Sequence, residues 1–120
     1  MNDQQTTLHD LKELVKKFVA ERDWSQYHNA KNLSMNTAME AAELMEIFVW
    51  ADSNQIQETF DKNRTEIEHE LADVVWSIIC LCNRYDIDLA GAIERKVAIT
   101  AQRYPVEKCR GKALKYTKLT

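Results

Sequence analysis

The chain of 120 residues suits one small domain, residues 1–120, and its 16 Lys and Arg against 19 Asp and Glu give a formal net charge of −3 at pH 7. Hydrophobic residues make up 45% and charged residues 29%, an ordinary usage that excludes a disordered or collagen-like chain. Two glycines and one proline are too few for the turns of a β-sandwich or for a Gly-rich phosphate loop, so an all-α fold is predicted.

The first half of the chain predicts two helices joined by a loop. Thr7 followed by Asp10 is typical of a helix N-terminal cap, and the apolar spacing after it predicts a helix that ends near residue 22. Residues 23–32 mix aromatic and polar side chains without a period and predict a loop. A second helix is predicted over residues 33–51, with an apolar stripe made of Leu33, Thr37, Leu44, Ile47 and Ala51.

The second half predicts two further helices and a tail. The polar residues 52–61 allow a short helical turn, and a long helix is predicted over residues 63–84, with its stripe at Ile67, Leu71, Val74, Ile78, Leu81 and Tyr85. Asp88 is typical of the cap of a fourth helix, which ends before Pro105 because the residue preceding a proline avoids the α region. Residues 106–120 are predicted to form an irregular basic tail.

Charge and cysteine usage bear on partners and compartment. Without the tail, residues 1–105 carry 11 basic and 18 acidic side chains, which disfavours nucleic-acid binding and is compatible with divalent cations. Cys80 and Cys82 lie in an apolar stretch and indicate buried thiols in a reducing compartment rather than a metal pair. The polar first residues and the lack of a long apolar run predict a cytoplasmic protein without a signal peptide or a membrane span.

Glu40 is the most informative residue, because helical spacing places it in the middle of the apolar stripe of the second helix. A carboxylate at such a position is costly unless it is paired or bound to a metal. Glu43 lies three residues further along the same side, and Glu70 and Asp73 repeat this spacing on the third helix. Two such pairs on two packed helices predict a site for Mg²⁺, which prefers oxygen ligands and commonly works with phosphate substrates.

Other interpretations of these acidic residues remain open. The four carboxylates are alternatively surface charges at a helix boundary, each paired with Lys or Arg. Glu66 and His69 match half of a di-iron site, but the sequence contains no second Glu-x-x-His. His69 followed by Glu70 lacks the second histidine of a zinc-protease helix, so His69 is interpreted as an ordinary surface histidine.

Seven short motifs follow one another over residues 21–119, and the resemblance that they carry covers about residues 8–119. They are ERDW at 21–24, YH at 27–28, N-L at 32–33, ExxE at 40–43, ExxD at 70–73, KxxxTxxRYP at 96–105 and KYTKL at 115–119. In this order they resemble the MazG-type all-α nucleoside triphosphate pyrophosphohydrolases, most closely the dCTP pyrophosphatase branch. The resemblance implies a four-helix MazG-like bundle that hydrolyses a (deoxy)nucleoside triphosphate, with dCTP-like pyrimidine dNTPs expected, to monophosphate and pyrophosphate in nucleotide-pool cleansing.

The resemblance also implies the residues of the metal site and of the phosphate site. The Mg²⁺ ligands, with Mn²⁺ as a substitute, and the catalytic carboxylates are Glu40, Glu43, Glu70 and Asp73. Lys96 and Arg103 match positions where the family places cations near the phosphates, and their alternative role is a solvated helix face. Lys115 and Tyr116 are expected to reach the phosphate site of a neighbouring subunit, or else to tie down the C-terminal segment.

The family's base-pocket positions are matched by Trp24, His28, Asn32 and Trp50, although the two tryptophans also fit core or dimer-interface packing.

The sequence departs from the family pattern at three positions. Met39, Ser77 and Thr100 replace an acid, a tyrosine and an asparagine, and these changes bear on base preference and phosphate contacts. An obligate homo-oligomer is expected in part because four helices around an acidic cleft bury little apolar core, and the resemblance implies a dimer or a tetramer.

Two other functions remain compatible with these patterns. One is a phosphatase or diphosphohydrolase that releases products other than pyrophosphate. The other is a helical interaction module in which the acidic cluster holds a structural metal or binds a basic partner. The position of Glu40 favours a metal in all of these cases, so the sequence alone does not separate them.

Overall fold

Every element of the structure is helical, in agreement with the prediction from composition. The computed structural model describes residues 1–120 and divides into two compact units, residues 1–87 and 88–120. The first unit contains α1 (Leu8–Glu21), the 3₁₀ turn η1 (Trp24–Tyr27), α2 (Ala30–Glu46), α3 (Ile56–Lys62) and α4 (Arg64–Tyr85). The second contains α5 (Leu89–Arg103), α6 (Val106–Cys109) and the 3₁₀ turn η2 (Tyr116–Lys118). None of these helices combines the length and the hydropathy that a bilayer span requires.

α1 begins where the sequence predicts, because Thr7 and Asp10 cap it reciprocally. The Thr7 hydroxyl accepts a hydrogen bond from the Asp10 amide at 3.1 Å, and the Asp10 carboxylate accepts one from the Thr7 amide at 2.8 Å. The bond from the Thr7 amide is the main cause that holds the pKa of the Asp10 carboxyl below its ordinary value. The helix then buries Val15 and Val19 in a core that also contains Leu33, Ile79 and Cys80.

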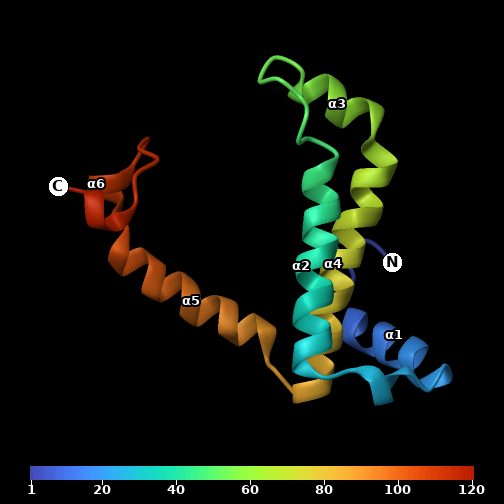
Figure 1. Ribbon diagram of the computed structural model, residues 1–120. Coiled ribbons are helices and arrows are strands. Elements are labelled where there is room, and N and C mark those ends of the chain that lie inside the picture. Colours follow the sequence, from blue (N-terminus) through green and yellow to red (C-terminus); the bar gives the residue numbers. More distant parts are fainter. The chain divides into compact units, whose positions relative to one another are not determined.

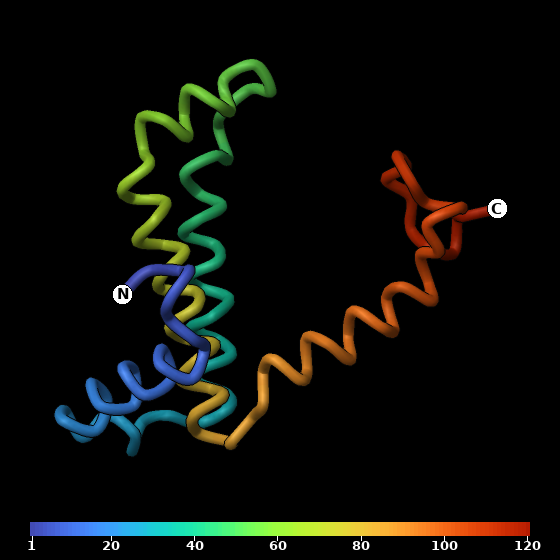
Figure 2. Tube along the Cα trace, turned by 180° about the vertical axis from the view of Figure 1, so that it is seen from behind, coloured from blue at the N-terminus to red at the C-terminus, as the bar shows by residue number.

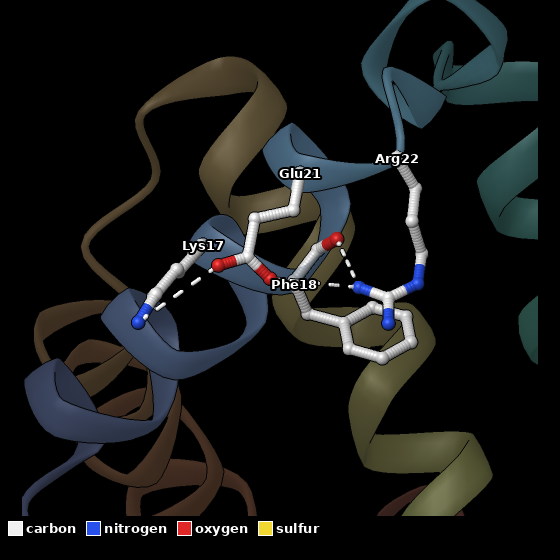
Figure 3. Close-up of polar contacts among 4 residues, drawn as sticks. All are labelled: Lys17, Phe18, Glu21 and Arg22. Atoms are coloured by element: carbon white, nitrogen blue, oxygen red, sulfur yellow. Dashed lines mark hydrogen bonds and ion pairs between the residues drawn. The ribbon is translucent and has the colours of Figure 1, made fainter.

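The end of α1 is joined to the following turn by contacts around Phe18 (Figure 3). The Arg22 guanidinium lies over the Phe18 ring at 3.5 Å, and one of its nitrogens donates to the Phe18 carbonyl at 3.1 Å. The same ring packs edge-on against Trp24 of η1, with ring centroids 5.7 Å apart, and against Trp76 of α4, at 5.0 Å. Phe18 therefore anchors η1, and with it Trp24, to α1 and α4.

The predicted bounds of the second helix are wrong at both ends. α2 begins at Ala30 because the Asn29 side chain accepts a hydrogen bond from the Asn32 amide at 2.8 Å and caps the helix. The helix ends at Glu46, and residues 47–50 continue as turns rather than as helix. The short turn that the sequence allows after this segment is present as α3.

α2 and α4 run antiparallel and lie side by side along most of their length (Figures 1 and 2). α4 follows its predicted bounds to within one residue. The stripe predicted for α4 is only partly buried, because Ile67 is 3% exposed but Leu71 and Tyr85 are 48% and 46% exposed. α4 also packs against α1, and this second contact buries Ile79 and Cys80, which lie off the predicted stripe.

The second unit confirms the predicted fourth helix and corrects the predicted tail. The Asp88 carboxylate accepts a hydrogen bond from the Gly91 amide at 3.1 Å and caps α5, which ends at Arg103. Residues 106–120 are not wholly irregular, since they include α6 and η2. Tyr104 holds this segment on the end of α5, because its hydroxyl accepts a hydrogen bond from the Tyr116 amide at 3.2 Å and the two rings pack edge-on.

Candidate functional site

Three carboxylates converge where α2 and α4 face each other. Glu40 and Glu43 come from α2 and Glu70 comes from α4, and one oxygen of each lies within 4.8 Å of the others. Glu40 and Glu70 are half-buried, whereas Glu43 is exposed. We call these three residues the carboxylate trio. The helical spacing of Glu40 and Glu43 places both side chains on the side of α2 that packs against α4.

Asp73 is the fourth predicted ligand and lies close to the trio without being one of its three members. It follows Glu70 by three residues on α4, so both side chains share one side of that helix. Its negative charge helps to raise the pKa of both Glu40 and Glu70. The structure therefore brings together three of the four predicted ligands and keeps Asp73 within electrostatic range of them.

The trio is an unfavourable arrangement of charge without a cation. Burial raises the pKa of Glu40 above its ordinary value, and the negative charges of Glu43 and Asp73 raise it further. Burial is also the largest cause of the raised pKa of Glu70, followed by the charges of the same two neighbours. In addition, Glu70 Oε2 is buried and has no hydrogen-bond partner.

The alternative in which the carboxylates are paired surface charges does not describe this structure. The ion pairs of the chain join Lys17 and Arg22 to Glu21, Lys62 to Glu58, and Arg64 to Glu68. None of them includes a member of the trio or Asp73. The negative charge of the trio is therefore not compensated by a basic side chain.

A hollow of about 400 Å³ opens beside the trio, and its lining is mostly acidic and polar: Glu43, Glu46, Ile47, Asn63, Glu66 and Glu70. In the sequence, Glu66 stands out only as half of a di-iron motif. Glu46 is exposed and also lines the hollow, as does Glu66. Their spacing of three residues from Glu43 and four from Glu70 is the signal that could have placed them here.

The donor set of this site fits a hard divalent cation. Carboxylate oxygens are the ligands that Mg²⁺ and Mn²⁺ prefer, and the trio contains no nitrogen or sulfur ligand. The unpartnered Glu70 Oε2 is the kind of buried acceptor that a bound cation satisfies. The cysteines are not part of this site: Cys80 and Cys82 are buried free thiols, and burial raises the pKa of Cys80 to about 11.

Three of the predicted base-binding residues lie at the connection between α1 and α2. His28 lines a cavity of about 280 Å³ bounded by side chains of α1, η1 and α4, and burial lowers the pKa of its imidazole. The His28 carbonyl accepts a hydrogen bond from Arg84 Nε at 2.9 Å. Asn32 is engaged locally, since its side-chain amide donates to the Tyr27 carbonyl at 3.0 Å. Trp24 is 45% exposed.

Trp50 does not join these residues. It lies in the turns that follow α2, whereas Trp24 and His28 precede that helix, and it is 91% exposed. α2 has 17 residues, so at 1.5 Å per residue the two groups lie about 25 Å apart along the helix axis. One chain therefore does not place Trp24 and Trp50 on the same base.

The remaining predicted residues belong to the second unit. Lys96 lines an open hollow on α5 together with Ile93, Val97, Thr100, Ala101 and Tyr104. Arg103 lies over the Tyr116 ring, with the guanidinium carbon 5.0 Å from the ring centroid. Tyr116 thus helps to tie down the C-terminal segment, which is one of the two roles expected for it, and Lys115 directly precedes η2.

The sequence comparisons with known proteins agree with one another. A sequence model of the MazG-like family matches residues 35–119. Over 115 residues, the chain is 39% identical to dCTP pyrophosphatase 1 of Mus musculus and 36% identical to dCTP pyrophosphatase 1 of Homo sapiens. Each match covers 94% of this chain and 68% of the relative.

A solved structure shows the same fold. The crystal structure of a pyrophosphatase from Archaeoglobus fulgidus superposes with a TM-score of 0.80 at 31% sequence identity, covering 88% of this chain and 98% of that one. The family match, the relatives and this superposition agree with the resemblance and the all-α fold predicted from the sequence. The chain belongs to the MazG-like family.

Proposed function

We propose that this MazG-like enzyme, a nucleoside triphosphate pyrophosphohydrolase, acts on dCTP-like pyrimidine dNTPs in the cytoplasm and removes them from the nucleotide pool. The products are the nucleoside monophosphate and pyrophosphate. The observation that supports the chemistry most directly is the convergence of Glu40, Glu43 and Glu70, of which Glu70 has a buried oxygen, Oε2, without a hydrogen-bond partner. The names of the mouse and human relatives support the choice of dCTP.

The carboxylate trio is the proposed holder of Mg²⁺, with Mn²⁺ as a substitute, and Asp73 completes the ligand set. When bound, such a cation neutralises phosphate oxygens and stabilises the charge that develops during attack of water on the α-phosphorus. The chain's own contribution is to hold three acidic side chains at fixed positions on two rigid helices. Glu46 and Glu66 add negative charge along the adjoining hollow and disfavour entry of a phosphate that lacks a cation.

Recognition of the base is assigned to Trp24, His28 and Asn32 at one end of α2 and to Trp50 at the other. Aromatic rings stack on all bases and discriminate only weakly among them. Trp24 and Trp50 are exposed and are available for such stacking. Because the length of α2 separates the two rings, both reach one base only if they come from two copies of the chain. This supports a homo-oligomer, in which Lys96, Arg103 and Lys115 serve as phosphate contacts.

Replacement of Glu40 by Gln tests the carboxylate site. The amide keeps the side-chain volume but removes the negative charge that a cation needs, so we expect Glu40→Gln to lose nearly all turnover while the protein stays folded. The assay is hydrolysis of dCTP with Mg²⁺, with products separated by chromatography and folding followed by circular dichroism.

The matched control is Glu13→Gln, an exposed glutamate on α1, which we expect to keep wild-type activity. Wild-type protein is expected to yield dCMP and pyrophosphate. Near wild-type turnover by Glu40→Gln contradicts the site, release of orthophosphate by the wild type identifies a phosphatase, and absence of turnover in the wild type supports an interaction module.

The stabilisation of the protein by Mg²⁺ is expected to depend on pH. Because the folded-state pKa values of Glu40 and Glu70 are raised above the ordinary 4.5, these groups favour the metal-free fold at low pH, and this contribution is lost as the pH rises through the raised values. Mg²⁺ needs the ionised carboxylates, so it stabilises most above those values, by about 2.7 kcal/mol at a hundred times Kd.

Differential scanning fluorimetry with and without Mg²⁺ measures this effect at about pH 4.5, near the ordinary glutamate pKa, and at about pH 7.5, well above it. We expect a clear rise in Tm at the higher pH, a smaller rise at the lower pH, and little response in Glu40→Gln. A Tm that is indifferent to millimolar Mg²⁺ at the higher pH contradicts the cation site.

Base selectivity is expected to be modest. Ser77 and Thr100 stand where the family pattern has longer polar side chains, so fewer buried hydrogen-bonding groups are available to reject a wrong base. We expect dCTP or 5-methyl-dCTP to be the best substrate, with kcat/KM ratios of only about 10–100 between bases. Trp24→Ala should raise KM for all dNTPs by similar factors, because it removes stacking rather than base-specific contacts. A purine favourite, or a preference above about 10⁴ for one base, contradicts this account.

A further inference from the structure

The most deeply buried side chain of the protein is polar. Ser77 of α4 is 1% exposed, and its hydroxyl accepts a hydrogen bond from the Asn36 side-chain amide of α2 at 2.6 Å. Asn36 is half-buried, and 41 residues separate the two positions in the sequence. It is the hydrogen bond between two side chains that joins the helices bearing the carboxylates, and at the end of the contact away from those carboxylates the Tyr85 hydroxyl of α4 accepts another from the Ala30 amide of α2 at 2.8 Å.

The bond lies in the same register as the carboxylate site. Along α2, Glu40 lies four residues after Asn36, and Glu43 lies three residues after Glu40. Along α4, Asp73 lies four residues before Ser77, and Glu70 lies three residues before Asp73. Because the two helices are antiparallel, a residue that follows Asn36 on α2 lies opposite the residue that precedes Ser77 by the same number of positions on α4. The register that pairs Asn36 with Ser77 therefore also brings Glu40 and Glu43 of α2 opposite Asp73 and Glu70 of α4, in keeping with the convergence of Glu40, Glu43 and Glu70.

Few apolar residues are fully buried along the part of the contact that bears the carboxylates, Ile67 of α4 being one, at 3% exposed. Leu33 is the one fully buried residue of α2, and it lies before Asn36 rather than among the carboxylates. The carboxylates themselves repel one another and so oppose the close approach of the two helices. A slip of one turn, about 5.4 Å, would break the hydrogen bond between the Asn36 amide and the Ser77 hydroxyl. Both groups would then lie unpaired in the helix interface, where unpaired polar groups are unfavourable. A single buried polar pair can specify helix register in this way.

We propose that Asn36 and Ser77 form a positioning pair that fixes the register of α2 against α4 and thereby assembles the cation site. The inference rests on the proposed function of the carboxylate trio and adds to it two residues that touch neither the cation nor the substrate. It also gives Ser77, which departs from the family pattern, a role inside the protein rather than in the substrate pocket.

The decisive variant is the double substitution Asn36→Leu with Ser77→Ala. It preserves the approximate shape of both side chains and leaves neither partner unsatisfied, so the fold is expected to persist with little change in Tm. The exchanged pair, Asn36→Ser with Ser77→Asn, restores a hydrogen bond between the same positions. Ser77→Ala alone is a milder third variant. Thr7→Ala, which removes the cap of α1 far from this interface, is the control for general loss of stability.

The measurement is the affinity for Mn²⁺, obtained from the electron paramagnetic resonance signal of the free ion, together with Tm. We expect the apolar double variant to bind Mn²⁺ about 10–100 times more weakly than the wild type, which is the range typical of losing residues that orient metal ligands. Ser77→Ala should change in the same direction. The exchanged pair should recover most of the affinity, and Thr7→Ala should lower Tm without weakening Mn²⁺ binding.

Wild-type affinity in both the apolar double variant and Ser77→Ala overturns the positioning role, because the bond is then only structural. A folded exchanged pair that fails to recover affinity also overturns it. Failure of the proposed function has a different signature: the wild type itself does not bind Mn²⁺, or Glu40→Gln binds it as tightly as the wild type does.

Discussion

The antiparallel contact between α2 and α4 is the constraint on which the candidate site depends. Neither helix carries all three carboxylates, and the trio exists only because Glu70 of α4 lies opposite Glu40 and Glu43 of α2. The helices come together through Leu33, the Asn36–Ser77 hydrogen bond and the core shared with α1. α1 and Phe18 then hold η1 against the same α4, which fixes Trp24 and His28 relative to the first unit.

The trio also explains why this contact needs specific support. Burial and mutual repulsion raise the pKa values of Glu40 and Glu70, and Glu70 Oε2 has no hydrogen-bond partner. A fold retains such an arrangement at a cost to its own stability, and clustered groups with perturbed pKa values are common where proteins bind ligands. The neutral Asn36–Ser77 pair lies one turn away and holds the helices together without adding charge.

Local sequence patterns were sufficient to predict the features of the fold and of the candidate site that depend on local structure. Glu40 stands out because a carboxylate interrupts an apolar stripe, and the caps at Thr7 and Asp88 depend only on residues within one turn. The Asn36–Ser77 bond was not predictable in this way, because it joins two helices and each residue alone is an ordinary polar residue. The early end of α2 likewise escaped prediction, since its apolar pattern continues through residues 47–51 after the helix stops.

We propose that the register of α2 and α4 creates a site for a divalent cation. Anomalous X-ray diffraction from crystals of the protein soaked in Mn²⁺ tests it most directly, because the signal locates the ion without assumptions about activity. The account predicts an anomalous peak between the carboxylates of Glu40, Glu43 and Glu70. An ordered Mn²⁺ bound elsewhere, with these three side chains free of metal, would contradict it.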